Sequence, residues 1–169
     1  MSGGPTPYVL DANVFVEAAR RYYAFDIAPG FWQALIKHAQ SSMVLSLDRV
    51  KDEIDKGNDD LKDWANNHFH LWFASTYDAD VINAYGRIMQ WGLKQSQFTD
   101  AAKAEFARAD NADAWLVAYV LAKGGVVVTE EKFDPKVKRK IPLPNVCRAF
   151  DVQYVDTFQM LRELGVKLS

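Results

Sequence analysis

Four acidic residues that are far apart in the sequence each lie where an expected strand ends or an expected helix begins. They are Asp11, Glu53, Asp113 and Glu131. Asp11 follows the apolar run Tyr8-Val9-Leu10, and Glu131 comes just after the run 126–129. In an open parallel sheet the carboxyl ends of the strands line one crevice, so such side chains can converge there. Because converging carboxylates repel one another, the pattern indicates a site for a hard divalent cation.

The composition indicates one globular domain. Of 169 residues, 49% are hydrophobic and 13% aromatic, which is enough for a substantial core. We expect residues 1–7 to be a flexible N-terminal segment and residues 8–169 to form the domain. The single cysteine, Cys147, excludes an internal disulfide framework and favours a reducing compartment. No apolar run is long enough to span a bilayer, so we expect a cytoplasmic protein with no membrane contact.

The charge distribution allows only local binding of a polyanion. The net charge is -2, so the protein as a whole has no field that attracts nucleic acid. Two short basic runs are candidates for an RNA contact, and each has the alternative of being a solvated loop. They comprise Lys136, Lys138, Arg139 and Lys140 in one run, and Arg20 and Arg21 in the other. Tyr22 and Tyr23, beside the second run, offer rings for base stacking or for core packing.

Strands and helices alternate along the chain, which predicts a three-layer α/β/α sandwich with a mainly parallel sheet. Strands are expected at 8–10, 43–47, 126–129 and 152–155. Helical patterns occupy 12–21, 29–40, 49–56, 59–73, 78–94, 99–106, a segment opened by 111–113 and ended by Gly124-Gly125, and a last helix after Asp156. Asp48 is expected to cap the helix at 49–56, and residues 132–144 are expected to form a loop rich in Lys and Pro.

Each candidate acid also has a structural interpretation. Asp11 fits a metal ligand, with Asn13 as a hydrogen-bond partner that orients it, but it also fits a helix cap. Glu53, taken alone, fits a solvated helical residue, and Asp113 complements a helix dipole. At the last position, Glu130 and Asp134 are rivals of Glu131.

Taken in order along the chain, the segments around these four acids resemble those of the PIN domain family of metal-dependent ribonucleases. The resemblance spans Tyr8 to Leu164. The segments that carry it are Val9-Leu10-Asp11-Ala12-Asn13, Val50-Lys51-Asp52-Glu53-Ile54, Ala112-Asp113-Ala114-Trp115-Leu116-Val117-Ala118 and Val127-Val128-Thr129-Glu130-Glu131. The stretch from Lys140 to Cys147 and the final helix are similar to a subfamily known mainly as uncharacterised prokaryotic domains. Some of its relatives are toxins of VapC-like toxin and antitoxin pairs.

The resemblance implies a PIN-like fold and hydrolysis of RNA by in-line attack of a water molecule, with Mg2+ or Mn2+ as cofactor. Asp11, Glu53, Asp113 and Glu131 match the family's four acids, of which Asp11, Asp113 and Glu131 are expected to bind the metal. Asn13 and Thr129 are expected to support them. The family more often has Asp where this chain has Glu131, which leaves Glu130 and Asp134 as alternatives. The resemblance also implies a cognate antitoxin and a homodimer as partners.

Three alternatives remain beside the nuclease. A haloacid-dehalogenase-like phosphatase also starts with an Asp at a strand end, but it has a second Asp where this chain has Asn13. A non-catalytic PIN module that binds RNA or a protein is the second, and a toxin whose biology is dominated by its antitoxin is the third. The histidines, His38, His68 and His70, lie in helical patterns and do not suggest a general base.

Overall fold

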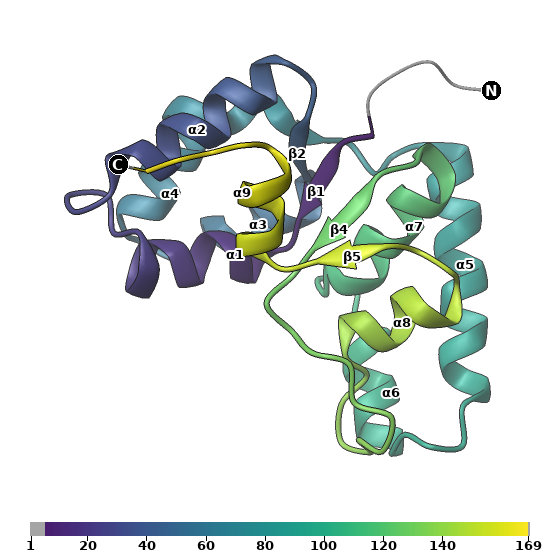
Figure 1. The fold of residues 1–169 in the computed structure, drawn as a ribbon. Helices are drawn as coiled ribbons and strands as arrows, with labels where there is room; N and C mark the ends of the chain where they lie inside the picture. Colours follow the sequence, from purple (N-terminus) through teal and green to yellow (C-terminus); the bar gives the residue numbers. More distant parts are fainter. Residues whose placement is uncertain (1–5, 169) are drawn as a thin grey trace.

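The computed structural model describes residues 6–168, which form a five-stranded sheet with every neighbouring pair of strands parallel. The strand order is β3-β2-β1-β4-β5. The strands are β1 (Tyr8–Leu10), β2 (Val44–Leu47), β3 (Phe73–Ala74), β4 (Val126–Val128) and β5 (Tyr154–Val155). Helices lie on both sides of the sheet (Figure 1), which confirms the predicted α/β/α sandwich. Residues 1–7 are expected to be flexible, but residues 1–5 lie outside the described part of the chain.

Nine α-helices within the described residues connect or follow the strands. They are α1 (Ala12–Glu17), α2 (Pro29–Gln40), α3 (Asp48–Asp55), α4 (Asp60–Trp64), α5 (Ala79–Lys94), α6 (Asp100–Phe106), α7 (Asp113–Lys123), α8 (Leu143–Ala149) and α9 (Thr157–Glu163). Shorter π and 3-10 turns extend α1 and α4: η1 (Ala18–Tyr22), η2 (Ala65–Phe69) and η3 (His70–Trp72). No helix among these residues is both long and apolar enough to cross a membrane.

The chain winds outward from the centre of the sheet in two directions. From β1 it proceeds to β2 and β3, and from β4, on the other side of β1, it proceeds to β5. Right-handed crossovers in opposite directions place their helices on opposite faces. Accordingly, α2 and α4 lie on one side of the sheet, and α5 and α7 lie on the other (Figure 1). The reversal leaves a crevice beyond the carboxyl ends of β1 and β4, the usual position of a ligand in such sheets.

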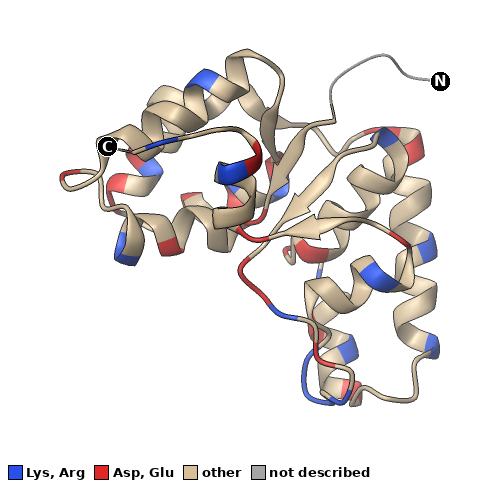
Figure 2. Cartoon of the chain, viewed as in Figure 1, with Lys and Arg blue, Asp and Glu red and all other residues tan. Residues whose placement is uncertain are grey.

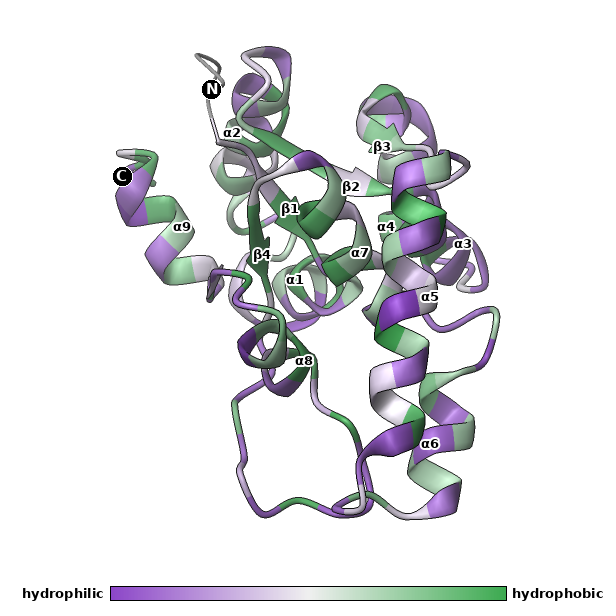
Figure 3. Ribbon diagram, turned by 90° about the vertical axis from the view of Figure 1, so that its right-hand side faces the viewer, coloured by the Kyte–Doolittle hydropathy of each residue, from purple (hydrophilic) through white to green (hydrophobic). Residues whose placement is uncertain are grey.

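The central strands are buried on both faces. All three residues of β1 and all three of β4 are buried, and Figure 3 shows both strands and α7 as hydrophobic, whereas α5 and α6 alternate. The entry to β4 depends on Gly125, whose φ is +131°. A Cβ at this position would lie 2.9 Å from the carbonyl oxygen of Pro7, which also accepts a hydrogen bond from the Val126 amide at 2.9 Å. A glycine is therefore needed to bring β4 alongside β1.

The structure differs from the sequence predictions at several elements. The predicted helix at 59–73 is broken into α4, η2 and η3, and it ends in β3, an edge strand that the pattern does not reveal. The stretch 132–144 is expected to be a loop, but α8 begins within it, at Leu143. Pro144 lies in the first turn of α8, where a proline is tolerated. Asp48 does not cap α3: Leu47 holds the cap position, and the Asp48 carboxylate instead accepts hydrogen bonds from the amide and hydroxyl of Thr76.

Candidate metal centre

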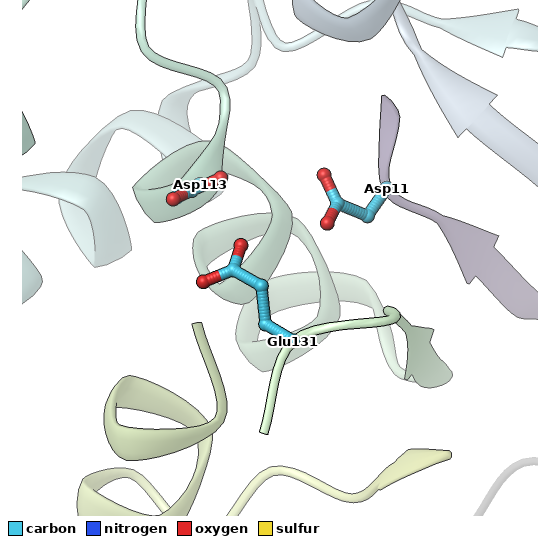
Figure 4. Close-up of side chains that lie close together, drawn as sticks. All are labelled: Asp11, Asp113 and Glu131. Carbon is cyan, nitrogen blue, oxygen red and sulfur yellow. The ribbon is translucent and has the colours of Figure 1, made fainter. Parts of the chain in front are cut away.

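Three carboxylates converge beyond the carboxyl ends of β1 and β4. Asp11 follows β1, Asp113 begins α7 and Glu131 lies in the connection after β4. One carboxylate oxygen from each lies within 4.8 Å of those of the other two. The side chains point toward a common centre (Figure 4). Oxygen donors at this separation, from three separate segments, fit a hard divalent cation such as Mg2+ or Mn2+.

Asp11 occupies the N-cap position of α1, but its side chain does not cap the helix. Its carboxylate instead accepts a hydrogen bond from the Thr129 hydroxyl at 2.9 Å, while its amide donates to the Val128 carbonyl at 2.9 Å. The Thr129 hydroxyl oxygen in turn accepts from the Glu131 amide at 3.1 Å. Thr129 therefore connects the two strand ends and fixes the carboxylate of Asp11 relative to the backbone of Glu131.

Glu53 supports the site from its edge rather than joining the three closest carboxylates. It projects from α3 and accepts a hydrogen bond from the Ala112 amide at 3.2 Å. This amide immediately precedes Asp113, whose own amide donates to the Asn111 side chain at 2.9 Å. Glu53 thus helps to hold the first turn of α7, from which Asp113 reaches the centre, and it lines the same pocket. The alternative that Glu53 is merely a solvated helical residue does not fit this contact.

Of the three rivals for the last acidic position, only Glu131 reaches the centre. Glu131 also accepts hydrogen bonds from the Leu143 amide at 3.2 Å and pairs with Lys140 at 3.1 Å. Glu130 points the other way and accepts hydrogen bonds from the amide and hydroxyl of Thr157 at the start of α9. Asp134 accepts from the Lys136 amide in an exposed turn. Figure 2 shows the acidic positions that mark this connection after β4.

Burial and the repulsion between negative charges make the carboxyl groups of Asp11, Asp113 and Glu53 harder to ionise. Burial, together with the charge of Glu131, raises the pKa of Asp11 to about 7, although the Thr129 hydrogen bond acts in the opposite direction. Burial, then the charges of Asp11 and Glu131, raise the pKa of Asp113 well above its usual value. Burial also raises the pKa of Glu53. A divalent cation would offset this repulsion, so the electrostatics as well as the donor atoms fit a metal ion.

The carboxylates line a pocket of about 270 Å3 that is open to solvent. Asn13 lines it too, at the edge shared with a second hollow beside Tyr22 and Phe158. Two further cations, Lys56 and Arg108, contribute to the wall. Neither residue is recognisable from the sequence as part of a site, because both are isolated basic residues and not part of a charge run.

The basic residues expected to contact RNA are spread over different places. Lys140 lies at the pocket, where its neighbour Glu131 raises its pKa despite the opposing effect of burial. Lys136, Lys138 and Arg139 are exposed in a loop whose backbone is tied to α6 by a hydrogen bond from the Thr99 amide to the Lys138 carbonyl. Arg20 and Arg21 are exposed on η1, and Arg21 pairs with Glu17 at 3.3 Å.

The two tyrosines beside Arg20 and Arg21 have different environments. Tyr23 stacks on Phe31 with the ring centres 4.5 Å apart, so it belongs to the core packing. Tyr22 is half exposed and contacts Phe158 edge to face. Cys147 is fully buried, and burial raises the pKa of its thiol to about 12, which agrees with a packing role.

Two solved structures contain a chain to which this chain is similar. For the crystal structure of FitAcB from Neisseria gonorrhoeae, the TM-score is 0.51 and the identity 17%, with 87% of this chain and 95% of that chain covered. For VapBC-1 from nontypeable Haemophilus influenzae, the TM-score is 0.48 and the identity 16%, with 88% of this chain and 96% of that one covered. At such identities the likeness to FitAcB concerns the fold alone. No curated protein matches the sequence.

At the level of sequence, one family model covers nearly the whole chain. It is described as a domain of unknown function, DUF4411, and it matches residues 8–168. The match includes the three central carboxylates and Glu53 as well as the connection that carries Thr129. With so much of its length matched, this chain belongs to the DUF4411 family.

Proposed function

We propose that this protein is a metal-dependent endoribonuclease that hydrolyses RNA phosphodiester bonds at the Asp11, Asp113 and Glu131 centre. The observation that carries the proposal is the convergence of three buried or half-buried carboxylates in one open pocket. A protein that needed these residues only for its fold would be more stable with neutral side chains there. The PIN-like fold and the order of the acids along the chain support the same activity.

Each residue has a role that follows from its contacts. Asp11, Asp113 and Glu131 would hold Mg2+ or Mn2+, which when bound neutralises phosphate charge and lowers the pKa of a water ligand. Thr129 orients Asp11, and Glu53 positions Asp113 through the first turn of α7. Asn13, at the mouth of the pocket, can hydrogen-bond to water or to a phosphate oxygen.

The recessed position of the carboxylates favours single-stranded RNA as substrate. A scissile phosphate must pass the rim of the pocket to reach them, and a flexible single strand can do so more readily than a rigid duplex. Lys140 offsets part of the negative charge of the wall, because its ammonium group lies 3.1 Å from Glu131.

The test is cleavage of a mixed pool of structured and unstructured RNAs with Mn2+, with Mg2+ and with EDTA. We expect cleavage that requires a metal and is lost in Asp11→Asn and in Asp113→Asn. The matched control is Asp80→Asn, which removes one exposed carboxylate outside the pocket. Near-full activity in both site variants, or cleavage that persists in EDTA, would contradict the proposal.

A second proposal concerns a partner protein. We propose that the acidic pocket also accommodates a segment of a cognate antitoxin, as the similarity to VapC-like toxins implies. The supporting observation is the excess of acidic over basic residues in the wall, which suits a cationic side chain. A toxin should arrest growth on expression and be neutralised by a small protein encoded nearby. Harmless expression of the wild-type protein in a host that lacks this small protein would instead favour a housekeeping nuclease or a non-catalytic binding module.

A further inference from the structure

A second charged group, at the rim of the metal pocket, is built from three residues on two separate segments. Lys56 is the C-cap residue that follows α3, and Arg108 and Asp110 lie between α6 and α7. The Asp110 carboxylate accepts hydrogen bonds from Arg108 Nε at 3.0 Å and Nη2 at 2.8 Å, and from Lys56 Nζ at 3.1 Å. Both cations line the pocket that contains Asp11 and Asp113, and they therefore face the path of any ligand that reaches the centre.

The donors of this group are arranged as a phosphate site would be. A guanidinium that gives two parallel hydrogen bonds, with an ammonium group beside it, binds carboxylate and phosphate oxygens in the same way. The side chains of Lys56 and Arg108 are 61% and 62% exposed, so an incoming polyanion can reach them. Exposed ion pairs of this kind are weak, and they can exchange one anion for another.

The proposed reaction needs such cations. Acidic residues outnumber basic ones in the wall of the pocket, and an RNA backbone would be repelled without compensation. Lys140 is already engaged by Glu131. Lys136, Lys138 and Arg139, the cations expected to bind RNA, are not part of the wall. Lys56 and Arg108 are therefore the cations of the pocket wall that can bind a phosphate.

We propose that Lys56 and Arg108 bind a phosphodiester of single-stranded RNA next to the scissile one, and that Asp110 occupies their donors until the RNA displaces it. This inference rests on the proposed nuclease function and adds a backbone-binding subsite to it. The contacts with Arg108 and then Lys56 lower the pKa of Asp110 to about 2. Asp110 therefore stays ionised at neutral pH and competes with the phosphate as a charged group.

The experiment measures binding of a short fluorescein-labelled oligouridine by fluorescence anisotropy in EDTA, where metal-dependent cleavage is off. Lys56→Gln and Arg108→Gln should each weaken binding about threefold or more and reduce the salt slope by about 0.7, the value for one lost phosphate contact on a single strand. Asp110→Asn should tighten binding about threefold or more, since the donors lose their competitor. The control Asp80→Asn changes the net charge equally but lies outside the pocket, and it should bind as the wild type does.

A double-mutant cycle separates displacement from a general charge effect. In the Lys56→Gln Arg108→Gln protein, Asp110→Asn should no longer tighten binding. Equal tightening in Asp110→Asn and Asp80→Asn, unchanged binding in the two Gln variants, or no RNA binding by the wild type would each overturn the inference. Cleavage with Mn2+ is measured separately. RNA cleavage without any role of Lys56 and Arg108 in binding contradicts the subsite alone, whereas binding through them without cleavage contradicts the nuclease.

Discussion

One pocket contains two groups of carboxylates in opposite electrostatic states. At its base, Asp11 is buried and Asp113 and Glu131 are half-buried, and desolvation and repulsion raise the pKa of Asp11 to about 7 and that of Asp113 well above its usual value. At its rim, Asp110 is exposed and its two cationic partners lower its pKa to about 2. Thus the exposed carboxylate at the rim is paired with two cations, whereas Asp11 and Asp113, which would be expected to help hold a metal ion, form no salt bridge within the described part of the chain.

The difference separates stability from function. Buried carboxylates that repel one another destabilise a folded protein. A bound cation would offset this repulsion and stabilise the folded state, which accounts for such residues at the base of the pocket. The ion pairs at the rim impose no such cost, because water screens them. The comparison predicts that substitutions at the base of the pocket change activity and pH dependence strongly, whereas substitutions of paired acids outside the pocket change little.

Adjacent glutamates give the sharpest test of this contrast. Glu131→Gln should lower metal-dependent cleavage by about a hundredfold or more, since even outer-shell partners of a metal are worth about 10–100-fold. Glu130→Gln makes the same chemical change one residue earlier, but its carboxylate contacts Thr157 at α9. We expect near-wild-type cleavage and a loss of about 1 kcal/mol in the free energy of unfolding. Similar cleavage rates in the two variants would place the centre elsewhere.

The pH dependence of stability should reveal the base of the pocket. In EDTA, the folded protein keeps a proton on Asp11 between about pH 4 and about pH 7, where the unfolded chain has released it. Folding is therefore favoured at the lower pH, and the free energy of unfolding should fall by roughly 2–4 kcal/mol as the pH rises through this range.

Denaturant titrations at several pH values measure this fall. Asp11→Asn should flatten it, because the amide does not titrate, and Mn2+ should restore stability at the upper end of the range. If the free energy of unfolding of the wild type in EDTA rose from about pH 4 to about pH 7, this would contradict the raised pKa of Asp11 in the folded protein.

The arrangement of the base follows from the sequence to a large extent. Continuous apolar runs in β1 and β4 are recognisable as central parallel strands, and the acids that follow them must meet beyond their carboxyl ends. Which of Glu130, Glu131 and Asp134 reaches the centre does not follow. Neighbouring residues point in different directions in an irregular connection, and the direction of Glu131 depends on its contacts with Thr129, Leu143 and Lys140.

The rim is harder to predict because it depends on contacts between distant segments. Lys56 and Asp110 are brought together where α3 contacts the segment before α7, and the hydrogen bond between Glu53 and Ala112 contributes to this contact. The edge strand β3 has two residues and follows a π and a 3-10 turn, so it leaves no periodic pattern. The prediction that Asp48 caps α3 is wrong for a related reason. Its carboxylate accepts a hydrogen bond from Thr76, which is distant in the sequence, instead of capping the helix.

Thr129 allows the base to be perturbed without removing a charge. Its hydroxyl donates to the Asp11 carboxylate and favours the ionised form, so Thr129→Val should raise the pKa of Asp11 further. At neutral pH we expect about tenfold weaker Mn2+ binding by calorimetry, and a smaller deficit at higher pH, where Asp11 ionises regardless. Thr129→Ser keeps the hydroxyl and should bind as the wild type does. Equal affinities of the Val and Ser variants would show that the hydroxyl does not tune the centre.

The smallest effect is expected at a paired carboxylate far from the pocket wall. Asp78 contacts Lys123 at 2.8 Å and caps α5 by accepting hydrogen bonds from the amides of Asp80 and Val81. Asn retains the capping oxygen but removes the charge, so Asp78→Asn tests the ion pair alone, whereas Asp78→Ala removes the cap as well. Asp78→Asn should leave cleavage unchanged and lower the melting temperature less than Asp78→Ala does, because a screened pair contributes little. A loss of cleavage in Asp78→Asn would mean that charge anywhere on the chain matters, and the distinction between uncompensated and paired carboxylates would lose its functional meaning.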